Sequence, residues 1–220
     1  MDDSTGLTVG SARDGVQPGA AADQDRRLVD LAQHGDVRAF EALVRRYQRW
    51  VFTLALRMVG DRADAEDLAQ EVFLKAYRGL SSFRGGSRFS TWLYAIASHH
   101  CLNHLASRGY RTKRETRSDS QADANGRMLP AGVERVADEA PGPDAALEQR
   151  DLRRAIEDAL AHMTADHRMA VVLRDIQGLS YEEIADTLGV ELGTVRSRLH
   201  RARMELKARL APVLSDGGER

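Results

Sequence analysis

The stretch 179–203 constrains the fold most, because its residues specify two short helices and the turn that joins them. Ser180 is followed three residues later by Glu183, the spacing of a capping box, which predicts the start of the first helix. Gly189 supplies the left-handed backbone conformation with which many helices end. The apolar face of this helix is formed by Ile184, Ala185 and Leu188. The pattern therefore predicts a half-buried helix followed by a tight turn.

The second helix of this stretch begins near residues 193–194 and is predicted to bury one side and to carry positive charge on the other. Its apolar stripe comprises Val195, Leu199 and Ala202. Its other face carries Arg196, Arg198, Arg201 and Arg203. Glu205 is the only acidic residue between positions 192 and 211, so the helix is strongly basic. These features are typical of a helix-turn-helix that reads DNA, and a solvated basic face is the alternative.

The overall composition limits the class of protein. The chain has 220 residues and a formal net charge of -1, which fits a DNA-binding protein only if acidic and basic residues are segregated. The single cysteine, Cys101, excludes an intramolecular disulfide and favours a reducing compartment. No apolar run approaches the roughly 20 residues that span a bilayer, and the acidic N-terminus differs from a signal peptide. We therefore expect a cytoplasmic protein without membrane insertion.

Apolar periodicity divides the chain into two helical parts, and no sustained alternation typical of strands is present. Residues 1–24 are polar and aperiodic and predict a disordered leader. Residues 25–108 and 146–211 carry helical periodicity, whereas 109–145 is rich in Gly, Pro, Ser and Asp and predicts a flexible linker. A short polar tail, 212–220, follows. The predicted fold is all-α, with two small helical domains joined by the linker.

Cap residues place the helices of the first domain. The first helix is expected from near Arg26, with an apolar face made of Leu28, Leu31 and Ala32. Three further helices are predicted to begin at the caps Asp36, Asp61 and Ser90. They are expected to end at Gly60, at Gly79 and near Ser107.

Three segments, in this order and at this spacing, resemble the extracytoplasmic-function (group IV) sigma factors of bacterial RNA polymerase, in the sigma-70 superfamily. They read DAEDLAQEVFLKAYRGLSSFRG at 64–85, SRFSTWLYAIASHHCLNHL at 87–105 and GLSYEEIADTLGVELGTVRSRLHRARMELK at 178–207. The resemblance implies a core-polymerase-binding helix, a promoter −10 reading helix and a −35 reading helix-turn-helix. It makes 25–108 the sigma region 2 domain and 146–211 the sigma region 4 domain.

The resemblance implies that the first segment grips the β′ clamp helices of core RNA polymerase. The residues expected in this contact are Asp64, Asp67, Leu68, Gln70, Glu71 and Phe73. An acidic, partly apolar helix can dock a basic partner helix, because complementary charge steers the encounter and sets the register. The alternative is a solvated face whose acids are favoured by the helix dipole.

The second segment, together with the start of the melting loop at the end of the first segment, is expected to recognise the −10 element and to hold the strand displaced when the DNA is opened. Binding a single strand calls for aromatic platforms and a basic lining. The residues expected here are Phe83, Arg84, Ser87, Arg88, Phe89, Trp92, His99 and Asn103. Trp92 either stacks on a base or packs on the core. His99 departs from the asparagine of many relatives and leaves the preferred base open.

The third segment is expected to place its second helix in the major groove of the −35 element. The residues expected to face the groove and its phosphates are Thr194, Arg196, Ser197, Arg198, His200 and Arg201. Arginine can donate two hydrogen bonds to guanine O6 and N7, which gives base discrimination. The resemblance also implies contact with the polymerase β flap, and an anti-sigma factor that wedges between the two domains.

One cluster, comprising His99, His100, Cys101 and His104, invites a metal or redox interpretation. His100 and His104 have the i, i+4 spacing that suits one metal ion. The preferred interpretation is that the cluster belongs to the −10 reading helix, with Cys101 as a small core residue and no metal or other cofactor.

Two other classes of function compete with a sigma factor. A conventional dimeric helix-turn-helix regulator would need a ligand pocket or dimer seam in residues 25–107, and the sequence offers an acidic helix and an aromatic, basic loop instead. An enzyme with an attached DNA-binding domain would need a catalytic constellation. No glycine-rich phosphate loop, nucleophile elbow or catalytic carboxylate pair stands out, so we expect a promoter-directing protein that is not an enzyme.

Overall fold

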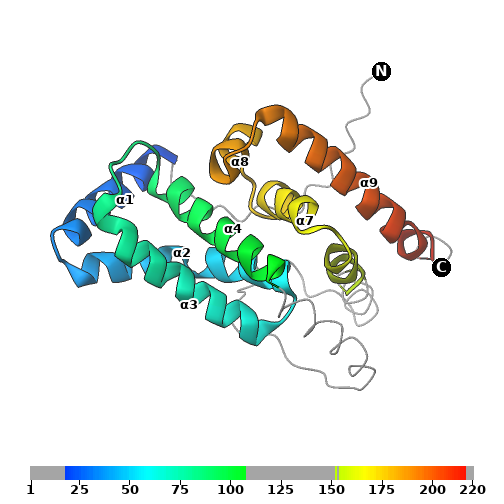
Figure 1. Cartoon of the computed structure of the whole chain (residues 1–220), viewed down its shortest axis with the longest axis horizontal. Helices are drawn as coiled ribbons and strands as arrows, with labels where there is room; N and C mark the ends of the chain where they lie inside the picture. The colour runs from blue at the N-terminus through cyan, green and yellow to red at the C-terminus, as the bar shows by residue number, and fades with distance from the viewer. Residues whose placement is uncertain (1–17, 108–151, 153, 217–220) are drawn as a thin grey trace, which may run out of the picture.

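The computed structural model describes residues 18–107, 152 and 154–216, and no strand occurs among them (Figure 1). The prediction of an all-α fold is confirmed for this part of the chain. The predicted linker, 109–145, and most of the predicted leader lie outside the described residues.

The N-terminal helical unit, residues 18–107, is built from four helices and one short turn of 3-10 helix. Their bounds are α1 Pro18–Gln33, α2 Val37–Val59, α3 Arg62–Gly79, η1 Leu80–Ser82 and α4 Phe89–Ala106. The predicted caps at Asp36 and Asp61 are confirmed, since each carboxylate accepts a hydrogen bond from a backbone N–H of the first turn. Gly60 ends α2 with φ of 73°, a conformation that L-residues rarely adopt.

Three local predictions in this unit are wrong. Helix α1 begins at Pro18 and not near Arg26, because proline suits the first helical position and the alanines that follow favour helix. Val29, and not Leu31, faces the core. Ser90 lies inside α4, whose N-cap is Arg88, because burial of Phe89 draws the helix start back to that residue.

The C-terminal helical unit, residues 152 and 154–216, contains the predicted helix-turn-helix. Residues 154–161 are helical, and the bounds of the later elements are α7 Ala165–Val171, η2 Val172–Ile176, α8 Tyr181–Leu188 and α9 Leu192–Asp216. The capping box is confirmed in both directions: the N–H of Glu183 donates to Ser180 Oγ at 3.0 Å, and the N–H of Ser180 donates to Glu183 Oε2 at 2.8 Å. Gly189 ends α8 with φ of 64°, as predicted.

The two units pack directly against each other. Helix α4 contacts both α7 and α8, and α2 contacts α7 and η2. Figure 1 shows α4 between α3 and the α7–α8 pair, with α9 on the outer side of that pair. Buried apolar residues from both units form one continuous cluster. The pattern of two domains on a linker did not predict this contact.

Candidate nucleic-acid interface

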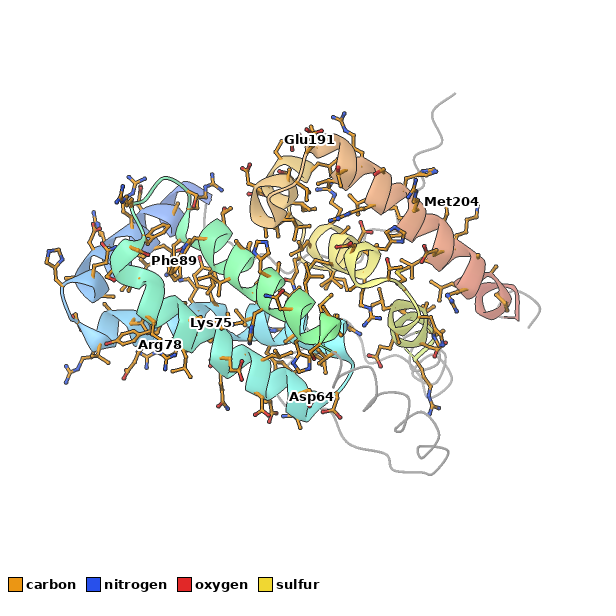
Figure 2. All side chains as sticks on the ribbon, in the orientation of Figure 1. Asp64, Lys75, Arg78, Phe89, Glu191 and Met204 are labelled. Carbon is orange, nitrogen blue, oxygen red and sulfur yellow. The ribbon has the colours of Figure 1, made fainter. Side chains whose placement is uncertain are left out.

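Helix α9 buries one side and exposes a stripe of polar and basic side chains on the other. The buried side consists of Val195, Leu199 and Ala202. The exposed stripe, called the α9 stripe below, consists of Arg196, Ser197, His200, Arg201 and Met204. Spacings of three and four residues put these side chains on one face of a helix. Met204, which is 58% exposed, lies on the outer side of α9 in Figure 2 and was not predicted as part of the site.

Two other arginines of α9 are bound to acids of neighbouring elements. Arg198 Nη2 lies 3.4 Å from Asp166 Oδ2 on α7. Arg203 Nη2 donates to Asp175 Oδ1 on η2 at 2.6 Å, and this hydrogen bond raises the pKa of Arg203. Arg198, which was expected to face the groove, is half-buried beside α7. Thr194 is half-buried at the start of the helix.

An aromatic cluster is formed by Phe83, in the loop before α4, and by Phe89 and Trp92, at the start of α4. Phe83 lies 5.1 Å from Trp92 and 6.2 Å from Phe89 between ring centroids, and Phe89 lies 5.7 Å from Trp92. Phe89 is buried, whereas Phe83 and Trp92 are each partly exposed. Phe89, labelled in Figure 2, is therefore the buried ring on which the other two pack. Trp92 packs on the core and also keeps an exposed part. Its position therefore suits both alternatives considered for it, core packing and stacking on a base.

The loop that carries Phe83 is held by a side chain of α1. Gln33 Nε2 donates to the carbonyl oxygens of Leu80 at 2.8 Å and of Phe83 at 2.7 Å. Beyond this anchor the chain turns at Gly85, which has φ of 70°. The polar residues of the loop predicted for DNA, namely Arg84, Ser87 and Arg88, are all exposed.

An open hollow of about 370 Å³ lies beside Trp92 on the surface of α3 and α4. Its walls are formed by Lys75, Trp92, Ala95, Ile96, His99, His100 and Asn103. Three residues predicted for the −10 element, Trp92, His99 and Asn103, are therefore brought together at one place. His99 Nδ1 donates to the carbonyl of Ala95 at 2.9 Å, which leaves its Nε2 as the outward polar atom.

His100 links α4 to α3, a role that was not predicted. Its Nε2 donates to Glu71 Oε2 at 2.6 Å, and Lys75 Nζ donates to its Nδ1 at 2.6 Å. Burial, followed by the charge of Lys75, lowers the pKa of His100 below its ordinary value. Glu71 and Lys75 are four residues apart on α3, and this spacing was the available signal for a shared partner.

The cluster around Cys101 shows no arrangement suited to a metal. Within residues 18–107, 152 and 154–216, no three His, Cys, Asp or Glu side chains are grouped so that they could hold an ion. Cys101 is buried, and burial raises the pKa of its thiol to about 12. A thiol with so high a pKa forms little thiolate, the species that binds metal or reacts with oxidants.

The outer face of α3 combines acidic and apolar side chains. Asp67, Gln70 and Glu71 are exposed on it as predicted, together with Leu74 at 54% and Tyr77 at 49% exposure. Tyr77 was missed because the apolar period of the helix assigns it to the core, whereas Leu74 lies outside that period and was not considered. The other residues predicted for this contact lie deeper: Asp64 and Phe73 are half-buried and Leu68 is 2% exposed. Leu68 therefore supports the face from the core.

The described helices include none long and apolar enough to cross a bilayer. The geometry defines a class of protein: a two-part helical DNA-binding factor with a basic helix-turn-helix, an aromatic loop and an acidic helix. Two family models match the chain, Sigma-70 region 2 over residues 43–111 and Sigma-70 region 4 over 153–206.

Curated relatives match over almost their whole length. The RNA polymerase sigma-H factor of Pseudomonas aeruginosa is 40% identical over 194 residues, which cover 88% of this chain and 97% of the relative. The ECF RNA polymerase sigma-E factor of Escherichia coli K12 is 40% identical over 190 residues, covering 86% and 96%. The chain belongs to the extracytoplasmic-function sigma factors of the sigma-70 family. It is a promoter-directing sigma factor, as predicted, and not the dimeric regulator considered as an alternative.

Two solved structures have the same fold. CnrH, in complex with the cytosolic domain of CnrY, has a TM-score of 0.60 and 25% identity, and the match covers 86% of this chain and 99% of CnrH. The sigma factor RpoE of Bartonella quintana, in complex with the anti-sigma factor NepR, has a TM-score of 0.55 and 25% identity, covering 80% and 98%.

Proposed function

We propose that residues 25–108 and 146–211 divide promoter recognition between them, with the α9 stripe reading the −35 element. The observation that carries this assignment is the stripe itself, on which Arg196, Ser197, His200 and Arg201 share one exposed face. An α-helix fits the major groove, and arginine and serine can both contact base edges or phosphates there. Arg198 is excluded from base contact in this proposal, because it is bound to Asp166.

The aromatic loop and the hollow on α4 are assigned to the −10 element and to the opening of the DNA. Phe83 and Trp92 offer partly exposed rings on which unpaired bases can stack, and stacking contributes about 1–3 kcal/mol for each base. Arg84 and Arg88 are exposed beside them and can contact phosphates. His99 and Asn103, in the wall of the adjacent hollow, can bond the edge of a displaced base.

The outer face of α3 is assigned to core RNA polymerase, where the β′ clamp helices would dock. Its acids provide charge complementarity to a basic helix, and Leu74 and Tyr77 provide the apolar area that binding needs. The β flap is assigned to the C-terminal helical unit on the basis of the family resemblance alone.

The proposal also includes a protein partner and assigns no catalytic activity to the chain. The solved relative from Bartonella quintana is bound to an anti-sigma factor, which supports a comparable partner for this chain. We assign the chain to the cytoplasm, where core polymerase and DNA are found, and give it no catalytic activity and no cofactor. Its effect on transcription would come from binding alone.

Run-off transcription with purified core polymerase and a panel of promoters tests the assignment. Arg196→Ala and Arg201→Ala should each lower transcript yield about 5-fold to 150-fold, the effect of one lost base contact of about 1–3 kcal/mol. Arg209→Ala is the matched control, because Arg209 is exposed on the same helix but lies about 140° around the axis from Arg196. Equal yields from all three variants would remove the α9 stripe from the −35 contact.

A further inference from the structure

His100, on α4, is held between an acid and a base of α3, and its two ring nitrogens have different partners. Its Nε2 donates to Glu71 Oε2 at 2.6 Å, and its Nδ1 accepts from Lys75 Nζ at 2.6 Å. These partners fix the protonation of the ring, because a lysine ammonium can only donate and a carboxylate can only accept. His100 is therefore neutral, with its proton on Nε2. This chain of two hydrogen bonds is called the His100 bridge below.

The His100 bridge changes the position that Lys75 would otherwise take. Glu71 and Lys75 are four residues apart on α3, with the acid on the N-terminal side, and this order favours a direct ion pair along the helix. The side chain of His100, which is 12% exposed, bonds to both of them instead. The Lys75 ammonium therefore lies on the side of α3 that faces α4 (Figure 2).

The ammonium held by the bridge lies in the wall of the hollow beside Trp92. Lys75 and His100 line this hollow together with His99 and Asn103, the two residues assigned to the edge of a displaced base. A strand that enters the hollow brings phosphates, which are the groups that a lysine ammonium binds in nucleic acids. The sequence pattern placed Lys75 on the helix assigned to core polymerase, so a contact with DNA was not predicted for it.

We propose that Lys75 binds a phosphate of the displaced strand and that His100 is the positioning residue that holds its ammonium at the hollow. The proposal rests on the assignment of the hollow to the −10 element. A long side chain that is ordered before binding loses less conformational entropy when the strand arrives, so the bridge strengthens the phosphate contact. Glu71 remains available to polymerase, because its side chain is 59% exposed.

Protonation of His100 breaks the bridge. A protonated ring donates from both nitrogens, so Nδ1 no longer accepts from Lys75 and two positive charges face each other. The titratable groups that face His100 are Glu71 and Lys75 on α3 and His104 on α4. Burial and the charge of Lys75 lower the pKa of His100 below its ordinary value of 6.5. The neutral ring is therefore the form present at pH 7.5, and Lys75 is released only below pH 6.5.

Two substitutions of His100 separate positioning from a merely structural role. The amide of His100→Gln keeps an acceptor for Lys75 and a donor for Glu71 and does not titrate, whereas His100→Phe offers neither. Opening by each holoenzyme is followed at pH 7.5 with 2-aminopurine in the −10 element. His100→Gln should retain the natural rate, and His100→Phe should open about 2-fold to 12-fold more slowly, the effect of leaving one long side chain unordered. Equal rates for the two variants would overturn the positioning role.

The dependence of opening on pH gives an independent readout of the bridge. As the pH is lowered from 7.5 to 5.5, the rate of the natural chain divided by that of His100→Gln should fall, because only the natural ring can be protonated. His162→Gln is the matched control, since it removes an exposed histidine of the C-terminal unit and should keep the natural pH profile. A ratio that stays constant, or that falls already above pH 6.5, contradicts the role of His100.

The phosphate contact is tested at Lys75, which is exposed. The probe is a fork-shaped promoter fragment with a single-stranded −10 region, bound by the holoenzyme at several salt concentrations. Lys75→Gln should reduce the slope of log affinity against log salt by about 0.7, the value for one phosphate of a single strand. Arg62→Gln removes a positive charge about 20 Å away along the same helix and should leave the slope unchanged.

The outcomes at Lys75 and Asn103 separate this inference from the promoter assignment. If Lys75→Gln keeps the natural salt slope while Asn103→Ala still slows opening, the phosphate contact is refuted and the −10 assignment stands. If both variants open the DNA at the natural rate, the −10 assignment of the hollow fails. A methylphosphonate at one position of the strand should weaken binding by the natural chain and not by Lys75→Gln, which would identify the phosphate.

Discussion

Replacing Gln33 by alanine should impair opening of the −10 region without weakening the −35 contact. Gln33 is the side chain of α1 that holds the aromatic loop, through hydrogen bonds of 2.8 Å to the Leu80 carbonyl and 2.7 Å to the Phe83 carbonyl. A neutral hydrogen bond contributes about 1 kcal/mol net, and exposure to water reduces that value, so the pair should stabilise the ordered loop by about 1–2 kcal/mol. The ratio of ordered to disordered loop should then fall about 5-fold to 30-fold.

The assay is the fluorescence of 2-aminopurine placed in the −10 element, which reports unstacking as the DNA opens. We expect the opening rate of the Gln33→Ala holoenzyme to fall, with this factor as the upper limit, while binding to an isolated −35 duplex is unchanged. Gln48→Ala is the matched control, because Gln48 is exposed on α2. Thermal unfolding should move by only a few degrees, since the lost bonds lie at the surface. An opening rate equal to that of the control would refute the role of α1 in positioning the loop.

Two further predictions concern single residues. Gly189→Ala should destabilise the chain by about 1 kcal/mol, because Gly189 has φ of 64°. Gly193→Ala should be neutral or stabilising, since Gly193 lies inside α9 with open space around it. The midpoints of thermal denaturation of the two variants should differ by a few degrees, and equal midpoints would contradict the reasoning. Cys101 should resist thiol reagents at pH 8 until the chain unfolds, because burial raises the pKa of its thiol to about 12. A pKa that is raised in the folded state stabilises the fold below about pH 9, and this contribution should be lost as the pH rises from about 9 to 12. The variant Cys101→Ala should reduce that loss of stability. Rapid labelling of the native protein would show that the thiol is accessible.

Local features were predictable because the interactions that create them span only a few residues. The capping box of Ser180 and Glu183, the left-handed Gly189 and the caps at Asp36 and Asp61 all follow from neighbours within four positions. The start of α1 was missed because residues 18–24 lack an apolar period, although Pro18 and the alanines after it are local helix signals. The burial of Asp25, which accepts hydrogen bonds from Arg46 and Tyr47 on α2, depends instead on distant residues.

The sequence predicted which segments form the candidate site better than it predicted which of their side chains are exposed. Arg198 and Arg201 are both basic residues of one helix, but Arg198 is half-buried and lies 3.4 Å from Asp166 on α7, whereas Arg201 is exposed. Tyr77 continues the apolar period of its helix and looks like a core residue in the sequence, yet it is 49% exposed in the structure. Which face of a helix is covered depends on the neighbours that the fold brings to it.

The sequence by itself determined the helices, their ends, the helix-turn-helix and the sigma-factor family, since these depend on local hydrogen bonding and on the periodicity of apolar residues. Tertiary structure alone decided which arginines of α9 face outward, which rings of the aromatic cluster are exposed and how the two units meet. Arg168 and Met58 are 110 positions apart, and their contact depends on how two complementary surfaces pack. Such packing leaves no periodic signal in the sequence, because any buried arginine with a nearby carbonyl satisfies the same physical requirement.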